Sequence, residues 1–255
     1  MYETLEINRH GSVAELWLNR PDRLNALSGQ VLQELAEAAG HLDTDAEIRV
    51  VIVRGRGRAF SAGADLAGFP GLEDDNLRAA ADAGRVMADA LEAMRAITIA
   101  GIHGWCVGGG LVLAAACDLR IAADSAQFSI PEIDLGIPLA WGGIPRLVRE
   151  IGPALTKELV ITCRPFDSAE ALGCGFLNRV CSESDLDLQL RKLADEIAAK
   201  PILPVAATKR HCNAVTATMV GLERAWSDAD SLIAGLVDPE CQVARADYIK
   251  SRLGG

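Results

Sequence analysis

One pattern occurs twice in the first half of the chain: a run of mostly apolar residues, a loop rich in glycine and small residues, and a stretch with helical periodicity. The first unit starts at VVIVRG (residues 50–55) and leads to a helix expected at about 76–96. The second starts at ITIAGI (97–102) and leads to a helix that begins near Gly109. Short apolar runs bounded by turn residues are typical of buried strands. The repeated unit therefore predicts an α/β fold.

The remaining elements are expected from similar patterns. Polar and apolar side chains alternate on both sides of NRHGS, which predicts a β-hairpin at the start of the chain. Ser28 is a candidate N-cap for a first helix, because apolar side chains from Val31 to Leu42 share one stripe. Strands are expected at LRIAA and AQFSI, and an irregular segment at 131–147. From residue 151 the pattern is almost wholly helical, with candidate helices at about 153–162, 168–173, 184–199, 204–213, 217–235 and 239–252.

Composition argues against several classes of protein. Half of the 255 residues are hydrophobic, which is enough for a large core and disfavours disorder. The net charge of −10 disfavours a nucleic-acid or anionic-membrane surface, since either needs a basic face. The seven cysteines are scattered, without a C-x-x-C pair or histidines at metal-ligand spacing, so neither a disulfide framework nor a zinc site is indicated. Because we find no signal-peptide core and no membrane-spanning run, we expect a cytoplasmic protein without a metal.

The glycine-rich loops do not fit the common nucleotide-binding motifs. GRGRAF lacks the third glycine of a dinucleotide-binding loop, and GWCVGGG lacks the Lys and the Ser/Thr of a phosphate-binding P-loop. AFSAG resembles a nucleophile elbow around Ser61, but Ala59 stands where its first glycine should be, and no histidine is an evident partner. A serine hydrolase is therefore disfavoured.

Gly108, Gly109 and Gly110 stand where a helix must start, although each glycine costs roughly 0.5–1 kcal/mol relative to alanine in regular structure. Two reasons are possible: close packing of another group, or a ligand that needs bare backbone N–H groups. If the two apolar strands lie side by side, their loops leave from the same edge of the sheet, and N–H groups from both loops can converge on one point. Such a pair forms an oxyanion hole, and a helix N-terminus there favours developing negative charge. The alternative is that these glycines only permit tight turns.

Four segments together carry a family resemblance: NRPDRLNALS, GRGRAFSAGADL, GGGLVLAAACDLRIAADSAQF and PEIDLGIP. In order and spacing they resemble the enoyl-CoA hydratase/isomerase (crotonase) superfamily, from the first hairpin to about residue 180. The resemblance implies a spiral of repeated β-β-α units at 1–195, which holds an acyl-CoA site, and a helical region at 196–255 that assembles a trimer or a pair of trimers. It assigns the oxyanion-hole N–H groups to Ala64 and Gly109, and adenine-binding backbone to 62–66.

The resemblance also bears on acid–base chemistry. Hydratases of the family use two carboxylates, of which the PE glutamate is present as Glu132, whereas Val112 occupies the place of the other. Hydration normally divides its work between two groups. A single carboxylate suits a double-bond shift in an enoyl-CoA, in which Glu132 removes a proton from the α-carbon or γ-carbon to form an enolate and returns it at the other end. Three alternatives stay open: hydration with Asp134 as partner acid, another enolate reaction on a CoA thioester, and an acyl-CoA-binding protein without turnover.

Further residues are expected to contact the substrate. Apolar neighbours of Glu132 such as Ile137, Leu139 and Trp141 should raise its pKa towards neutrality. Arg23 is the candidate contact for a CoA phosphate, with Lys250 and Arg252 as alternatives, and Tyr248 is the candidate for packing on CoA. Besides CoA itself, which is part of the substrate, no cofactor is expected. The complete expected set of substrate contacts is Ala62, Gly63, Asp65, Leu66, Arg23, Gly108, Leu139, Trp141 and Tyr248.

Overall fold

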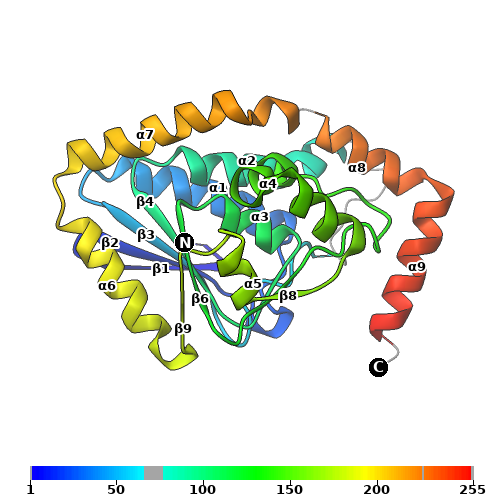
Figure 1. Ribbon diagram of the computed structural model, residues 1–255, viewed down its shortest axis with the longest axis horizontal. Helices are drawn as coiled ribbons and strands as arrows, with labels where there is room; N and C mark the ends of the chain where they lie inside the picture. Colours follow the sequence, from blue (N-terminus) through cyan, green and yellow to red (C-terminus); the bar gives the residue numbers. More distant parts are fainter. Residues whose placement is uncertain (1, 66–76, 226, 254–255) are drawn as a thin grey trace.

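A computed structural model describes residues 2–65, 77–225 and 227–253 (Figure 1). The main sheet contains six strands, and apolar residues dominate its inner members. These strands are β1 (Leu5–His10), β2 (Val13–Leu18), β3 (Val50–Gly55), β4 (Ile97–Ile102), β6 (Leu119–Ala123) and β9 (Arg179–Cys181).

Strand pairing follows the order of the chain. The order across the sheet is β1-β2-β3-β4-β6-β9, with an antiparallel β1/β2 hairpin and parallel pairing thereafter. The expected hairpin is thus confirmed. Strands β3 and β4 are parallel neighbours, with Val50 opposite Ile97 and Val53 opposite Ala100. The loops that follow these two strands therefore leave from the same edge of the sheet.

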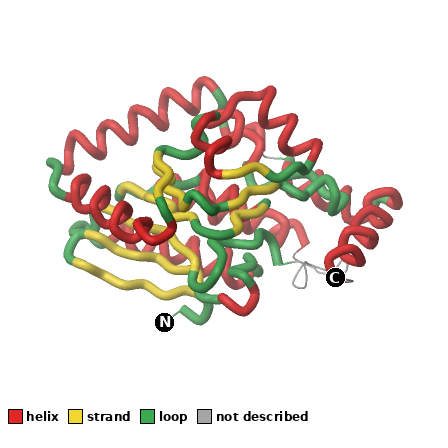
Figure 2. The backbone as a smooth tube through the Cα atoms, turned by 60° about the horizontal axis from the view of Figure 1, so that its bottom comes forward, coloured by secondary structure: helices red, strands yellow, loops and turns green. Residues whose placement is uncertain are grey.

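Both faces of the sheet are covered, which explains why the inner strands are apolar without interruption. On one face, Val51 and Val53 pack with α1 (Gly29–Thr44) and α2 (Leu77–Ala93). On the other face, Val50 and Ile52 pack with α6 (Leu186–Ala198). Figure 2 shows these helices around the strands. The Ser28 hydroxyl accepts a hydrogen bond from the Val31 N–H (3.4 Å), so the expected N-cap is confirmed.

A second, smaller sheet lies next to the glycine loops. It contains β5 (Trp105–Val107), β7 (Gln127–Ser129) and β8 (Phe166–Asp167), in the order β5-β7-β8. Strand β5 lies inside the segment expected to be only a loop. The helix α3 (Gly109–Ala115) starts two residues after β5, which confirms the expected start near Gly109.

The C-terminal half differs from the expected pattern in four places. Helix α4 (Gly143–Thr162) begins ten residues before the expected 153, with a break at Gly152, where φ is 75°. Helix α7 (Ile202–Met219) extends beyond the expected 204–213 at both ends. The expected helix at 217–235 is interrupted after α7 by a short 3₁₀ helix, η4 (Leu222–Ala225). Strand β9 was not expected because it has only three residues, one exposed and two half-buried, which give no readable periodicity.

The last helices extend across and beyond the α/β core. Helix α7 crosses over the helices of the core, and α8 (Asp228–Val237) and α9 (Pro239–Leu253) follow it around the opposite end (Figure 1). Helix α5 (Ser168–Gly173) connects β8 to β9. The boundary expected at residue 195 falls within α6 and stays a prediction. In the described parts of the chain, no helix has both the length and the apolar character that a membrane crossing requires.

Candidate active site

The loops after β3 and β4 run side by side and are joined by backbone hydrogen bonds. The Phe60 N–H donates to the His103 carbonyl (2.9 Å), and the Ser61 N–H donates to the Trp105 carbonyl (3.1 Å). The Val107 N–H in turn donates to the Ser61 carbonyl (3.0 Å). The register of these bonds brings the SAGAD segment to the start of α3.

Residues before α1 hold the first loop from its other side. The Asn25 side-chain amide donates to the carbonyls of Arg56 and Ala59, each at 2.8 Å. The Ser61 hydroxyl donates to the Asn25 carbonyl (2.9 Å). The Leu27 N–H donates to the Gly63 carbonyl (2.8 Å). The backbone around residue 64 is therefore fixed by contacts to two separate segments.

Two backbone N–H groups at this junction have no acceptor within the described part of the chain. They belong to Ala64 and Gly109, and neither donates a hydrogen bond to another described residue. The loops approach closely between them: a Cβ added to Gly63 would lie 3.5 Å from the Gly109 nitrogen and 2.7 Å from the Val107 oxygen. Both residues also line one cavity. The predicted meeting of the two loops is confirmed, and two unused donors lie at the meeting point.

That cavity has a volume of about 30 Å³. Its described walls combine two residues with unused N–H groups, one carboxylate and otherwise apolar side chains. Val112, which stands at the expected place of a second carboxylate, is among them. The lining residues are Ala64, Gly109, Val112, Glu132, Ile137, Pro138, Leu139, Ala140, Trp141 and Leu232.

Glu132 supplies the carboxylate of the cavity. It follows Pro131 in a tight turn, where the Leu135 N–H donates to the Pro131 carbonyl (3.0 Å) and the Ile137 N–H to the Glu132 carbonyl (2.9 Å). The side chain is buried, and its Oε2 atom has no hydrogen-bond partner among the described residues. Burial disfavours the charged form and raises the pKa of Glu132 to about 7. At neutral pH this group can therefore both accept and donate a proton.

Each of the three consecutive glycines has a different close neighbour. A Cβ on Gly108 would collide with the Glu132 carboxylate, and Gly108 also has a φ of 48°. A Cβ on Gly109 would collide with the Trp141 ring, and one on Gly110 would lie 2.9 Å from the Ser61 Cβ. Close packing thus explains all three glycines. The N–H group of Gly109 is in addition free to donate a hydrogen bond to a ligand in the cavity.

The other expected site residues lie at various distances from this cavity. Ala62 and Gly63 precede Ala64 in the loop, and Asp65 pairs with Arg20 at 2.8 Å. Arg23 is exposed at the end of a short 3₁₀ helix, η1 (Pro21–Arg23). Tyr248 is half-buried on α9 and does not line the cavity. Leu66 lies outside the described residues.

Two further titratable groups near the loops, Asp134 and His103, do not line the cavity. Asp134 is exposed and is not among the lining residues. His103, directly after β4, donates a hydrogen bond through Nε2 to the Gly57 carbonyl (2.8 Å). Glu132 is thus the only carboxylate among the described walls.

Sequence reasoning missed the groups that hold the Trp141–Gly142 turn. Trp141 has a φ of 62°, a left-handed conformation that costs a residue with a Cβ roughly 1–2 kcal/mol. The buried Arg146 guanidinium donates to the Trp141 carbonyl (3.2 Å), and the Asp228 carboxylate accepts from the Gly142 N–H (2.8 Å). Leu232, on the same helix as Asp228, was missed as a wall of the cavity because it is a hundred residues away along the chain. The one available signal was an arginine in an otherwise apolar stretch, GGIPRLV.

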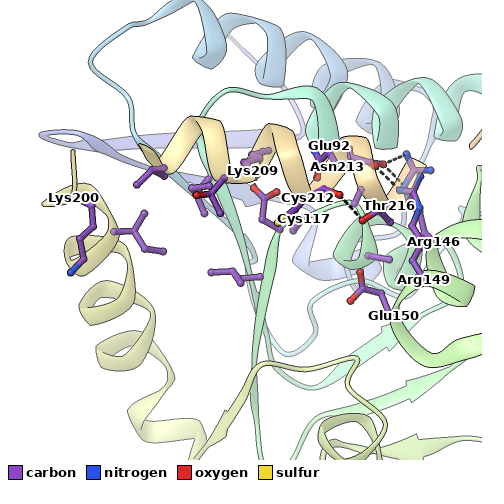
Figure 3. A pocket seen from close by; sticks show the side chains of 18 of the residues that line it. Glu92, Cys117, Arg146, Arg149, Glu150, Lys200, Lys209, Cys212, Asn213 and Thr216 are labelled. Atoms are coloured by element: carbon purple, nitrogen blue, oxygen red, sulfur yellow. Dashed lines mark hydrogen bonds and ion pairs between the residues drawn. The ribbon is translucent and has the colours of Figure 1, made fainter. Parts of the chain in front are cut away.

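A larger cavity of about 650 Å³ lies beneath α7, apart from Glu132 (Figure 3). Glu92, Arg146 and Arg149 meet at one end of it, and Lys200 lies at the other. Its charged wall groups are largely paired: Lys209 Nζ donates to the Asp118 carboxylate (2.7 Å) and to the Ala96 carbonyl (2.9 Å). Among the described residues, no three His, Cys, Asp or Glu side chains are grouped so that they could hold a metal ion.

Comparison with known proteins gives consistent similarities. A family model described as enoyl-CoA hydratase/isomerase matches residues 8–232. A probable enoyl-CoA hydratase of Mycobacterium tuberculosis is 41% identical over 200 residues, which are 77% of this chain and 76% of that protein. A peroxisomal Δ3,5-Δ2,4-dienoyl-CoA isomerase of Arabidopsis thaliana is 37% identical over 224 residues, with 82% and 81% covered. The crystal structure of a probable enoyl-CoA hydratase of Mycobacterium smegmatis superimposes with a TM-score of 0.82 at 32% identity and covers 91% of this chain and 94% of that chain. These likenesses confirm the expected α/β fold.

Proposed function

Because the chain belongs to the enoyl-CoA hydratase/isomerase family, we propose that this enzyme moves a double bond along an enoyl-CoA with Glu132 as its only proton carrier. One observation carries the choice of reaction: Glu132 is the sole carboxylate among the described walls of the cavity, and Val112 lines it where hydratases place their second. Adding water requires that the water be activated and that a proton be delivered, and two groups normally share this work. A double-bond shift needs one group that gives back the proton it takes.

The proposed mechanism starts with the thioester carbonyl between the N–H groups of Ala64 and Gly109. Ionised Glu132 removes a proton from C2 of a 3-enoyl-CoA, and the electron pair moves to the carbonyl oxygen to form a dienolate. The two N–H groups stabilise this oxygen more than the original carbonyl, and one such donor contributes about 3 kcal/mol. Protonated Glu132 then delivers the proton to C4, which leaves the double bond between C2 and C3. Atoms and charge balance, and the carboxylate is regenerated.

We extend the proposal to the contacts of the CoA moiety. The backbone of Ala62–Asp65 leads from the cavity towards η1, where Arg23 is exposed in a protein with a net charge of −10. Arg23 is therefore proposed as a CoA phosphate contact, and the backbone from Ala62 onward as the adenine site. Tyr248 is proposed to pack on CoA, and Leu139 and Trp141 to contact the acyl chain beside Glu132. The chemistry calls for no metal or redox group, since CoA arrives with the substrate.

Hydration is the second candidate reaction, because several similar proteins are named as hydratases. A test offers 3-enoyl-CoA and 2-enoyl-CoA separately in deuterated water and follows the products. The proposal predicts migration of the 3-enoyl double bond, loss of this reaction in Glu132→Gln, and little 3-hydroxyacyl-CoA from the 2-enoyl compound. Asp134→Asn is the matched control, since it removes an exposed carboxylate two residues away and should retain turnover. Formation of 3-hydroxyacyl-CoA as the main product, or tight binding without turnover, would overturn the proposed reaction.

We also propose that the chain assembles as a trimer or a pair of trimers. The support lies in the C-terminal helices, where apolar side chains are exposed on three successive elements. These include Leu203, Val215 and Met219 on α7, Val237 on α8, and Val243 on α9. Exposed apolar side chains favour burial against another subunit.

A further inference from the structure

The Trp141 indole fills the space between two helices at the wall of the Glu132 cavity. A Cβ on Gly109, at the start of α3, would collide with the six-membered ring of Trp141. A Cβ on Gly84, in the middle of α2, would collide with the atoms at which the two rings of the indole join. Helices α2 and α3 thus approach the ring through glycines, and the ring occupies the volume that two side chains would need.

Trp141 is held in this place by a buried charge network behind it. The Arg146 side chain is 1% exposed and donates to the Trp141 carbonyl, while its other nitrogens donate to Glu92 (2.8 and 3.0 Å) and Asp89 (2.8 Å) of α2. The next peptide N–H, that of Gly142, donates to Asp228 of α8. Arg146 also lines the cavity beneath α7, at the end where Glu92 and Arg149 lie (Figure 3). Three helices therefore fix the backbone from which the indole extends.

The remaining room beside the proposed reaction centre is small. The cavity has a volume of about 30 Å³ and is lined on its polar side by Ala64, Gly109 and Glu132. Its apolar side is lined by Trp141, Leu139 and Leu232, among others. A volume of this size takes only about two water-sized groups. An acyl chain whose thioester lies at Ala64 and Gly109 therefore meets the indole after a few carbon atoms.

We propose that Trp141 limits acyl-chain length and that the substrates are therefore short-chain acyl-CoA thioesters. Arg146 is the positioning residue that keeps the Trp141 ring in place. This inference rests on the proposed acyl-CoA site. It goes beyond that proposal because it assigns the substrate class to one side chain. Removal of the indole opens the space between Gly84 and Gly109, into which a longer chain can extend.

The test measures binding of saturated acyl-CoA esters with chains of 4, 6, 8, 10 and 12 carbon atoms by calorimetry, because binding does not depend on which reaction is catalysed. For the wild-type protein, affinity should be highest at the shortest chains and fall at least tenfold by eight carbons. Trp141→Ala should reverse this preference, with at least a tenfold gain for octanoyl-CoA and a loss for butyryl-CoA. Trp105→Ala, which removes an exposed indole from β5, is the matched control and should leave the preference unchanged.

Two additional variants test where the ring lies and what holds it. Gly84→Ala should weaken butyryl-CoA binding at least tenfold because its Cβ displaces the ring. When Trp141 is already replaced by Ala, adding Gly84→Ala should not weaken acyl-CoA binding any further, because the ring is no longer there to be displaced. Arg146→Lys keeps the charge but loses the forked donors, so it should flatten the chain-length preference with a larger change in KM than in kcat. An unchanged length preference in folded Trp141→Ala would overturn the inference, whereas failure of every acyl-CoA to bind the wild-type protein would overturn the proposed function itself.

Discussion

At the scale of single residues, Glu132 is distinguished by its burial, which raises its pKa, and by a carboxylate oxygen that has no hydrogen-bond partner among the described residues. Replacement by Gln keeps the shape and removes the ability to carry a proton. We expect Glu132→Gln to lower kcat by a factor of about 10² to 10⁴, the usual contribution of a general acid–base group. Steady-state kinetics with a 3-enoyl-CoA measures this, and circular dichroism checks the fold. Retention of more than a tenth of the wild-type kcat would exclude Glu132 as the proton carrier.

The pKa of Glu132 gives a second prediction, for the dependence of rate on pH. The carboxylate must be ionised to take a proton, so kcat/KM should rise with pH, reach half of its limit near pH 7, and level off above it. A pH–rate profile from pH 5 to 9 checks this. A profile already flat from pH 5 upward would show that the acting base is an unperturbed carboxylate.

The same pKa predicts an effect on stability. Because the pKa in the folded state, about 7, is above the ordinary 4.5, the native protein binds more protons than the unfolded chain between these values. The free energy of unfolding therefore falls as pH rises through this range, because ionisation of Glu132 is easier in the unfolded chain. The loss reaches about 3 kcal/mol at pH 8. Glu132→Gln carries no such penalty, so its Tm should match that of the wild type near pH 4.5 and exceed it by several degrees at pH 8. If the Tm of Glu132→Gln equalled that of the wild type at pH 8 as well as at pH 4.5, this result would contradict the raised pKa.

Several of these residues were predictable from the sequence, and others were not. Glu132, Gly109 and Ala64 stand next to one another in space as expected, since their segments carry recognisable motifs and the strands before two of them are parallel neighbours. Leu232 lines the same cavity from α8, a hundred residues after Glu132, and no local sequence pattern indicates a contact between residues so far apart. The left-handed Trp141 was equally hidden, because Arg146 and Asp228 determine its conformation from other helices.

At the scale of elements, α7 is joined to the core through a buried ion pair. Lys209 is the only buried residue of α7, and its Nζ donates to both the Asp118 carboxylate and the Ala96 carbonyl. Lys209→Met leaves the Asp118 carboxylate with only its bonds from Thr98, so we expect the free energy of unfolding to fall by about 3 kcal/mol. Urea denaturation measures this, with Lys200→Met, an exposed lysine beside the same cavity, as control. A loss below 0.5 kcal/mol would show that α7 is held by its other contacts.

Element boundaries were harder to predict where two signals opposed each other. The prolines at 138 and 145 suggested an irregular segment up to 147, yet Pro145 lies in the first turn of α4, where the missing N–H costs nothing. Gly152 then interrupts the helix just before Pro153, and the sequence pattern registered only the part after this break. The inner strands were predictable because burial on both faces gives a continuous apolar run.

At the scale of the whole molecule, the exposed apolar side chains of α7, α8 and α9 predict assembly. We expect light scattering after size-exclusion chromatography to give a mass of three or six chains. Met219→Glu together with Val243→Glu should shift this mass towards a single chain, because burying the new charges costs several kcal/mol. Leu188→Glu, an equally exposed position on α6, is the control and should leave the mass unchanged. A single-chain mass for the unaltered protein would reject the proposed assembly.

The order of strands in the main sheet has a consequence for synthesis. From β1 to β6, each strand that enters the sheet lies next to one made earlier, so a chain leaving the ribosome can add strands one by one without waiting for distant partners. The segments that carry Ala64 and Gly109 are therefore made before the other described walls of the Glu132 cavity. Leu232 and Asp228, on α8, are made some ninety residues after Trp141. A nascent chain would therefore possess both donors, Glu132 and most of the apolar wall well before Leu232 closes the cavity and Asp228 reaches the Gly142 N–H.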